Sequence, residues 1–150
     1  MLTSDPKPVR AVVMVQKEVA DKMLAGAGDM TLLGLMVQVY ASVRRVVNVP
    51  RGAFSPPPKV DSTVVRLDPF TVEDLDTHGV REPEKLITFA KVAFTQKRKQ
   101  LKSTLGTLPT VSVEVLEATL EELGHPATAR PQELSAKDWI YLYNKLHGYC

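Results

Sequence analysis

The chain has 150 residues and a formal net charge of +2, and its side chains are 44% hydrophobic and 24% charged. This composition is typical of a globular protein in water. It excludes a disordered chain, and no apolar run is long enough to span a membrane. The one cysteine, at position 150, excludes internal disulfides and favours a reducing, cytoplasmic location. The first residues lack the pattern of a secretory signal.

The charge is unevenly distributed along the chain. Residues 1–105 carry sixteen Lys and Arg against eleven Asp and Glu, whereas residues 106–150 carry three against six. A basic first part favours an anionic partner there, although this asymmetry alone does not identify one.

The first half of the chain alternates strands and helices. Residues 9–15 are mostly β-branched and apolar, which predicts a strand covered on both faces. The predicted elements after it are helices at 17–24 and 32–40 and strands at 43–49 and 61–67. This order is typical of an α/β layer architecture. These few elements cannot cover both faces of the first strand. We therefore expect residues 1–68 to be the last part of a larger sheet, and we expect apolar side chains along 9–15 to be exposed.

The second half is predicted to be helical. Residues 69–82 show no pattern and are predicted to form a linker, and residues 83–148 an all-helical domain. The predicted helices run from Pro83 to about Leu105, from Val113 to Leu123 before Gly124, and from the capping box Ser135–Asp138 to Gly148. Leu134 and Trp139 flank the last capping box as a hydrophobic staple.

The loop between the last two predicted strands contains one aromatic residue, Phe54, directly before a stiff segment. Three consecutive prolines, Pro56 to Pro58, restrict the backbone even without ladder hydrogen bonds. A ring held on such a loop can stack on an extruded base. The residues leave a second interpretation open, in which Phe54 fills the core beneath the loop.

A cluster of basic residues follows in the first helix of the second half: Lys91, Lys97, Arg98, Lys99 and Lys102. A continuous helix would place Lys91, Arg98 and Lys102 on one stripe, which suits a phosphate backbone. Lys97, however, falls where the next apolar residue is due, which indicates a kink or restart. A solvated face with surface ion pairs explains the cluster equally well.

Four segments resemble one protein family, in the family's order and over nearly the whole chain: Val15–Ala20, Val49–Ser62, Phe94–Leu101 and Arg130–Ser135. They are similar to segments of the small-subunit rRNA adenine dimethyltransferases. The resemblance implies the C-terminal strands and helices of a Rossmann-like methyltransferase sheet, followed by a small helical domain that grips rRNA.

The resemblance also implies a function in ribosome biogenesis. The family transfers methyl groups from S-adenosylmethionine to two adjacent adenines near the 3′ end of small-subunit rRNA. Phe54 matches the phenylalanine that flanks the target adenine, which favours base stacking over core filling. The family's use of its helical domain to grip rRNA favours the basic cluster as RNA contacts. Arg51 and Lys59 beside Phe54 are further expected RNA contacts, although surface solvation explains Arg51 equally well. The implied partner is small-subunit rRNA or a 30S-type particle, with no membrane.

Some of the family's motifs are missing from this sequence. The glycine-rich cofactor loop, the acidic ribose-binding residue and the Asn-Leu/Ile-Pro-Tyr motif belong before the matched region. Gly26 and Gly28 lack the surroundings of a cofactor loop and predict a turn. We therefore expect the chain alone to bind no cofactor and to be inactive without the family's N-terminal half as a further partner. A non-catalytic nucleic-acid-binding or ribosome-assembly module is the alternative.

Metal chemistry is not expected. The three histidines, His78, His125 and His147, are scattered, and none has a carboxylate or cysteine at the spacing of a metal ligand set.

Overall fold

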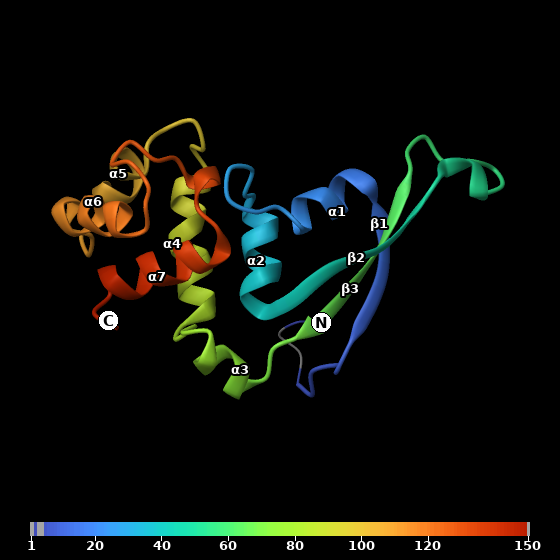
Figure 1. Ribbon diagram of the computed structural model, residues 1–150, viewed down its shortest axis with the longest axis horizontal. Coiled ribbons are helices and arrows are strands. Elements are labelled where there is room, and N and C mark those ends of the chain that lie inside the picture. Colours follow the sequence, from blue (N-terminus) through green and yellow to red (C-terminus); the bar gives the residue numbers. More distant parts are fainter. Residues whose placement is uncertain (1, 3–4, 150) are drawn as a thin grey trace.

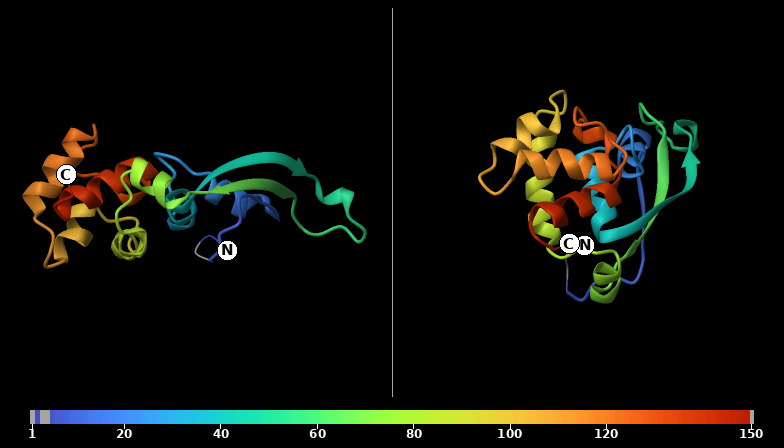
Figure 2. Two further views of the ribbon diagram at one scale, coloured as in Figure 1. Left: turned by 90° about the horizontal axis from the view of Figure 1, so that it is seen from below. Right: turned by 60° about the vertical axis from the view of Figure 1, so that its left-hand side comes forward.

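The computed structural model describes residue 2 and residues 5–149. Figure 1 shows an elongated molecule, with a sheet and two helices at one end and a group of helices at the other. The views in Figure 2 show the hairpin of the second and third strands projecting away from the helical end. The order of an α/β part followed by an all-helical part is the one that the sequence predicts.

The sheet has three antiparallel strands in the order β1–β3–β2. The strands are β1 (Ala11–Gln16), β2 (Ala41–Val49) and β3 (Ser62–Pro69). Val65 in the central strand lies opposite Val13 of β1 and Arg45 of β2. The register of β2 shifts between Arg45 and Val47. Such a bulge increases the local twist and bends the strand as it runs out to the loop.

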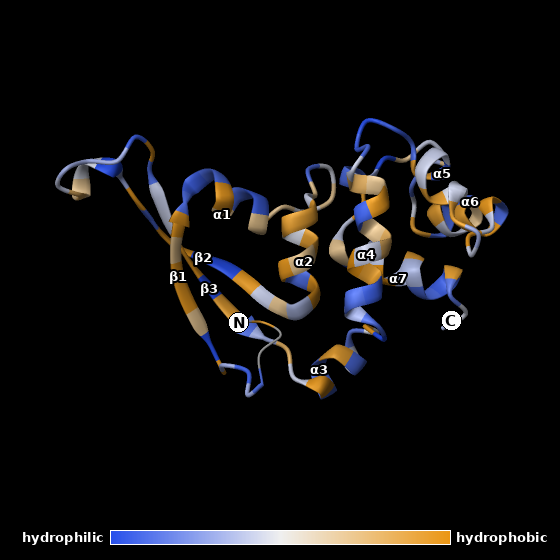
Figure 3. Cartoon of the chain, turned by 180° about the vertical axis from the view of Figure 1, so that it is seen from behind, coloured by the Kyte–Doolittle hydropathy of each residue, from blue (hydrophilic) through white to orange (hydrophobic). Residues whose placement is uncertain are grey.

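Strand β1 is covered on one face only. Its residues alternate between half-buried and exposed, and Val12 and Met14 are 59% and 52% exposed. The described residues leave the outer face of the sheet open, so they do not supply the second covered face that the pattern of the strand indicates. The prediction that this strand exposes apolar side chains is confirmed by these exposed fractions. Figure 3 colours much of β1 as hydrophobic.

Two helices lie between the first two strands along the chain, close to where the sequence predicts them: α1 (Lys17–Met23) and α2 (Leu32–Tyr40). Thr31 caps α2 by accepting the Gly34 N–H at 2.9 Å. A Cβ at Gly34 would lie 2.6 Å from the carbonyl oxygen of Lys22, so only glycine permits this close approach of α2 to the end of α1.

Helix α2 joins the two parts of the molecule. Its Val37 packs with α1 and the inner face of the sheet in a small core that includes Val65 and Leu67. Its Leu35 and Val39 belong to the large core of the helical part. A helix that is apolar on nearly all sides is typical of such a buried position.

The segment predicted as a linker contains a helix, α3 (Val72–Thr77). Thr71 and Asp74 form a capping box at its start, and Val80 after it is buried in the large core. The description of this segment as patternless is therefore corrected. A helix of six residues is too short to show an apolar stripe, and its capping box is the sequence signal that was missed.

The first long helix of the helical part ends earlier than predicted, at Phe94 instead of about Leu105. The helices after α3 are α4 (Pro83–Phe94), α5 (Leu101–Thr104), α6 (Val113–Glu122) and α7 (Ala136–Leu146). Single turns of 3-10 helix cover Arg51–Ala53, Leu105–Thr107 and Pro131–Glu133. A non-helical turn at 95–100 separates α4 from α5, as the polar Lys97 at an apolar position indicates.

The predicted capping box of α7 is present. Ser135 accepts the Asp138 N–H, and the Asp138 carboxylate accepts the Ser135 N–H. Leu134 and Trp139 are both fully buried in the large core, and the Trp139 indole donates to the Pro131 carbonyl oxygen at 3.3 Å.

Candidate nucleic-acid interface

The loop that carries Phe54 forms the tip of the β2–β3 hairpin, which projects from the sheet (Figure 1). Backbone bonds curl its first residues into a turn: the Ala53 N–H donates to Pro50 and the Phe54 N–H to Arg51, at 3.0 and 3.3 Å. The Phe54 ring is half-buried and belongs to neither apolar core. The turn therefore holds an aromatic side chain at the edge of the molecule.

The two cations expected beside Phe54 are both exposed. The Arg51 guanidinium donates to the Lys59 carbonyl oxygen at 3.4 Å, across the loop. A shallow cleft of about 480 Å³ lies between this loop and the start of α1, and it is lined by Lys17, Glu18, Asp21, Arg51, Lys59, Val60 and Asp61. The cleft combines cations with carboxylates, so it suits a ligand with phosphate groups and hydrogen-bond donors.

A polar network fixes the hairpin to α1 next to the bulge. The Arg45 guanidinium donates to Asp21 at 2.7 Å and to Asn48 at 2.8 Å, and the buried Thr63 hydroxyl donates to Asn48 at 2.9 Å. The Arg45 hydrogen bond, followed by that of Lys17, holds the pKa of the Asp21 carboxyl below its usual value. The Arg45 side chain is therefore occupied inside the hairpin.

The basic cluster does not form one helical stripe. Because α4 ends at Phe94, Lys97 and Arg98 lie on the turn that follows it. The Lys102 ammonium lies 3.2 Å from the Glu117 carboxylate on α6. Lys99 is exposed. The continuous-helix prediction is thus corrected, and Lys102 forms the surface ion pair that the alternative interpretation describes.

Part of the cluster surrounds a groove between the two parts of the molecule. The groove has a volume of about 560 Å³, and its cationic lining residues are Lys22, Lys91, Lys97 and Arg98. Lys22 comes from the end of α1 and was not among the predicted residues. Its only sequence signal is its place in the last turn of a predicted helix, which gives no indication that α1 lies beside the 95–100 turn.

The loop with Gly26 and Gly28 joins the sheet part to the helical part. The backbone N–H groups of Gly28 and Met30 both donate to the Gln132 carbonyl oxygen, at 3.0 and 3.1 Å. The Gly26 N–H donates to the Asp29 carboxylate at 2.9 Å. These amides are therefore used inside the protein, as the predicted turn requires.

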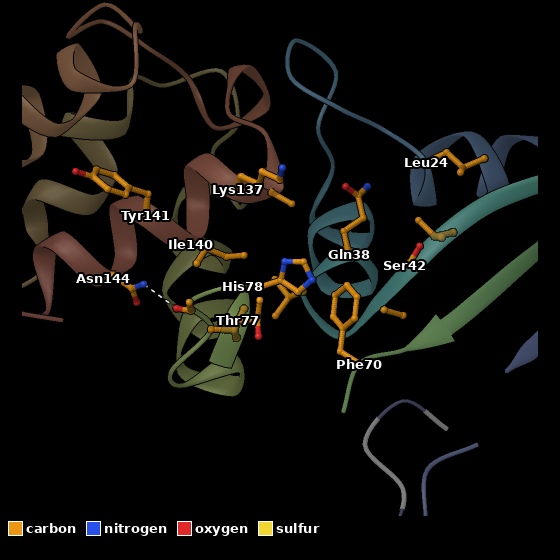
Figure 4. Close-up of a pocket in the computed structure, with 16 residues that line it drawn as sticks. Leu24, Gln38, Ser42, Phe70, Thr77, His78, Lys137, Ile140, Tyr141 and Asn144 are labelled. Carbon is orange, nitrogen blue, oxygen red and sulfur yellow. Dashed lines mark hydrogen bonds between the residues drawn. The ribbon is translucent and has the colours of Figure 1, made fainter. Parts of the chain in front are cut away.

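Another cleft lies elsewhere and contains no predicted site residue. It has a volume of about 900 Å³, and its lining residues come from α2, β2, α3 and α7 (Figure 4). The Asn144 amide donates to the Gly79 carbonyl oxygen at 2.7 Å, and the Phe70 and His78 rings lie 4.7 Å apart. Gly79 has a φ of +74°, which favours glycine at this turn.

The part of the chain that the structure describes contains neither a group of metal ligands nor a membrane-spanning helix. Within residue 2 and residues 5–149, no three His, Cys, Asp or Glu side chains are grouped so that they could hold a metal ion. In the same residues, no helix is both long and apolar enough to cross a membrane.

The sequence of the chain matches one family model and many curated proteins. The model for "Ribosomal RNA adenine dimethylase" matches residues 1–147. The Pseudomonas aeruginosa protein "Ribosomal RNA small subunit methyltransferase A" is 42% identical over 135 residues, which are 89% of this chain and 47% of that protein. The protein of the same name from Trichormus variabilis is 38% identical over 95% of this chain and 51% of its own length. The chain thus spans about half the length of these relatives.

Solved structures show the same similarity. A dimethyladenosine transferase from Plasmodium falciparum superposes with a TM-score of 0.74 at 26% identity, over 98% of this chain and 61% of the other. The 23S rRNA methyltransferase ErmE gives a TM-score of 0.74 at 25% identity, over 97% of this chain and 57% of the other. Together with the family match along residues 1–147, these likenesses confirm the resemblance seen in the sequence: the chain belongs to the ribosomal RNA adenine dimethylase family.

Proposed function

We propose that this chain is the C-terminal, rRNA-binding portion of an S-adenosylmethionine-dependent rRNA adenine dimethyltransferase. In this proposal the complete enzyme dimethylates two adjacent adenines near the 3′ end of small-subunit rRNA during ribosome biogenesis. The observation that carries it is the match of residues 1–147 to the family, over about half the length of relatives named as small-subunit rRNA methyltransferases.

Phe54 is the residue that meets the target base. A base can be methylated on its exocyclic amine only after it leaves the helical stack, and an extruded base is stabilised by stacking on an aromatic ring. The Phe54 ring belongs to neither core and lies on a turned, proline-rich loop. Arg51 and Lys59 beside it bind the phosphates that flank the extruded adenine.

The groove between the two parts binds the RNA backbone. Lys91, Lys97 and Arg98 from the helical part face Lys22 from α1 across it. A phosphodiester chain seated there contacts both parts at once, and its charge is neutralised by several cations. Lys99 adds to the positive surface outside the groove, whereas Lys102 contributes less because it is paired with Glu117.

The residues of this chain do not fit the cofactor. S-adenosylmethionine, when bound to a methyltransferase, supplies the methyl group. Here β1 passes directly into α1 without a glycine-rich loop, and the amides of the Gly26–Met30 loop are occupied by Gln132 and Asp29. We infer that the cofactor is held by residues outside this sequence, so the isolated chain is inactive and titration calorimetry with S-adenosylmethionine gives no saturable heat.

The RNA-binding proposal is tested by the salt dependence of affinity. The chain is titrated with a hairpin from the 3′ end of small-subunit rRNA at several salt concentrations. Replacing both Lys97 and Arg98 by alanine removes two phosphate contacts and lowers the slope of log affinity against log salt by about two units. The control is Lys85→Ala. Lys85 lies on α4 and is paired with Glu82, which directly precedes that helix. An unchanged slope in the double variant would contradict the groove as the backbone site.

A non-catalytic nucleic-acid-binding or ribosome-assembly module remains the second candidate. The observation that favours it is that the described residues offer cations and an aromatic ring but no fit for the cofactor. The two are separated by co-expressing this chain with the portion of the Pseudomonas aeruginosa relative that it does not match. Transfer of labelled methyl groups to small-subunit rRNA supports the enzyme portion; rRNA binding without transfer supports the module.

A further inference from the structure

The loop that presents Phe54 has a narrow neck. It leaves β2 after Val49 and re-enters the sheet at Ser62. The prolines inside it stiffen the backbone but donate no hydrogen bonds, so the donors that hold the loop come from other residues. A stiff loop with a free neck would swing as one body, and its orientation therefore depends on contacts at its base.

Asp61 makes two contacts at this neck, beside the bond from the Arg51 guanidinium to the Lys59 carbonyl oxygen. The Asp61 carboxylate accepts the Arg51 backbone N–H at 2.9 Å, which closes the loop between its first and last residues. The Asp61 carbonyl oxygen accepts the Lys17 backbone N–H at 3.0 Å, which attaches the same point to the start of α1. Asp61 thus connects both ends of the loop to the place where β1 passes into α1.

The Arg51 N–H is the critical donor in this arrangement. Arg51 begins the 3-10 turn whose last bond runs from the Phe54 N–H to the Arg51 carbonyl oxygen. The orientation of the Phe54 backbone is therefore set by Arg51, and that of Arg51 by Asp61. This chain of hydrogen bonds joins an exposed carboxylate to the backbone of Phe54 without involving either apolar core.

We propose that Asp61 is a positioning residue: its carboxylate closes the neck of the loop on the Arg51 N–H and thereby sets the orientation of Phe54, while its backbone carbonyl joins this point to the start of α1. The consequence for RNA rests on the proposed function of Phe54 as the platform for the extruded adenine. The carboxylate acts here as a hydrogen-bond acceptor, so its amide analogue, which retains one carbonyl oxygen, preserves the contact.

The variants that test this are Asp61→Ala and Asp61→Asn, with Asp74→Ala as the matched control. The Asp74 carboxylate also accepts a backbone N–H, that of Thr71 at 2.8 Å, but in the capping box of α3. The control therefore removes the same type of bond from another exposed site. All variants are made in the full chain, and thermal unfolding confirms that each is folded.

The first measurement needs no RNA. Amide hydrogen exchange by NMR reports the Arg51 N–H, and ¹⁹F NMR with 4-fluorophenylalanine reports the four phenylalanine rings, with Phe54→Tyr to assign its line. In Asp61→Ala we expect the Arg51 amide to exchange roughly fivefold faster and only the Phe54 line to shift and narrow. Asp61→Asn and Asp74→Ala should resemble the wild type in both signals.

The second measurement uses an RNA hairpin with 2-aminopurine in place of one of the two adjacent adenines. Asp61→Ala should leave the affinity within about twofold, since phosphate contacts dominate it, and make the fluorescence change on binding about fivefold smaller, since stacking is lost. Asp61→Asn should restore that change.

The outcomes separate the two proposals. An unaltered Arg51 exchange rate in Asp61→Ala, equal effects in Asp61→Ala and Asp61→Asn, or ¹⁹F shifts spread over all four rings would overturn the positioning role. If the wild-type chain binds the hairpin without any fluorescence change, the stacking role of Phe54 fails, and the Arg51 and ¹⁹F signals alone decide whether Asp61 positions the loop.

Discussion

The two parts of the molecule differ in how completely they bury their apolar side chains. The helical part encloses a large core in which Leu86, Leu101 and Trp139 are fully buried. The sheet part has a small core under one face of the sheet, while the other face exposes apolar side chains such as Met14 and Val47. Removal of apolar surface from water is the main source of folding free energy, so the helical part supplies most of the stability.

The less enclosed part also contributes to both surfaces proposed to bind RNA. Both candidate RNA-binding surfaces include residues of the less enclosed part: the Phe54 loop at its tip and Lys22 at its junction with the helices. The sheet part depends on α2, which packs into both cores. The comparison therefore indicates a stable helical base that supports, through α2, an extended arm with the proposed binding loop.

The most severe test of the helical base is Trp139→Ala. The indole is fully buried and contacts Phe89 and Phe94 with ring centroids 6.3 and 5.5 Å away. Truncation of a buried aromatic residue leaves a cavity and costs about 3–5 kcal/mol of unfolding free energy. Urea unfolding followed by circular dichroism measures it, since the only tryptophan is lost. A cost below that of a surface substitution would contradict the assignment of stability to this core.

The next test compares the two faces of the sheet. Leu67 is buried on the inner face, so Leu67→Ala should cost about 2–5 kcal/mol. Met14 is 52% exposed on the outer face, so Met14→Ala should cost only about 0.5 kcal/mol. Urea unfolding of both variants gives the two values. Similar values would mean that the outer face is covered in solution, and sedimentation at several concentrations would then show self-association.

The sequence predicted elements better than it predicted their contacts. Alternation, capping and turn residues located the strands and most helices, because these signals are local; the capping box at Ser135 is one example. The continuous basic stripe through Arg98 failed because the end of α4 depends on how the following turn packs. The presence of Lys22 in the groove was not predictable, since it results from packing between distant segments. The role of Asp61 likewise requires the loop to close on Arg51.

A smaller effect on stability is expected at the tip of the arm. Phe54 is half-buried and belongs to neither core, so Phe54→Ala should lower the unfolding free energy by less than about 1 kcal/mol. Thermal unfolding beside the 2-aminopurine assay checks it. A loss of about 3–5 kcal/mol, as for a buried ring, would show that Phe54 fills a core after all.

The smallest expected effect concerns a carboxylate that ties the end of the chain to the helical base. Glu82, directly before α4, forms an ion pair with Lys85 and accepts hydrogen bonds from the hydroxyl groups of Tyr149 and Tyr143. The Lys85 contact, followed by that of Tyr149, lowers the pKa of the Glu82 carboxyl from 4.5 to about 2. Burial, with the nearby Glu82 charge, raises the pKa of Tyr143 to about 12.

The sign of the pH dependence follows from the Glu82 shift. Because the pKa of Glu82 in the folded state lies below its ordinary value, its charge stabilises the fold fully above pH 4.5, and this contribution is lost as the pH falls to about 2. Glu82→Gln should therefore lower the melting temperature near neutral pH and match the wild type near pH 2. Glu84→Gln, in the first turn of α4, controls for removing a negative charge near the start of this helix. A constant difference between Glu82→Gln and the wild type across this range would show that the loss comes from packing rather than from the charge.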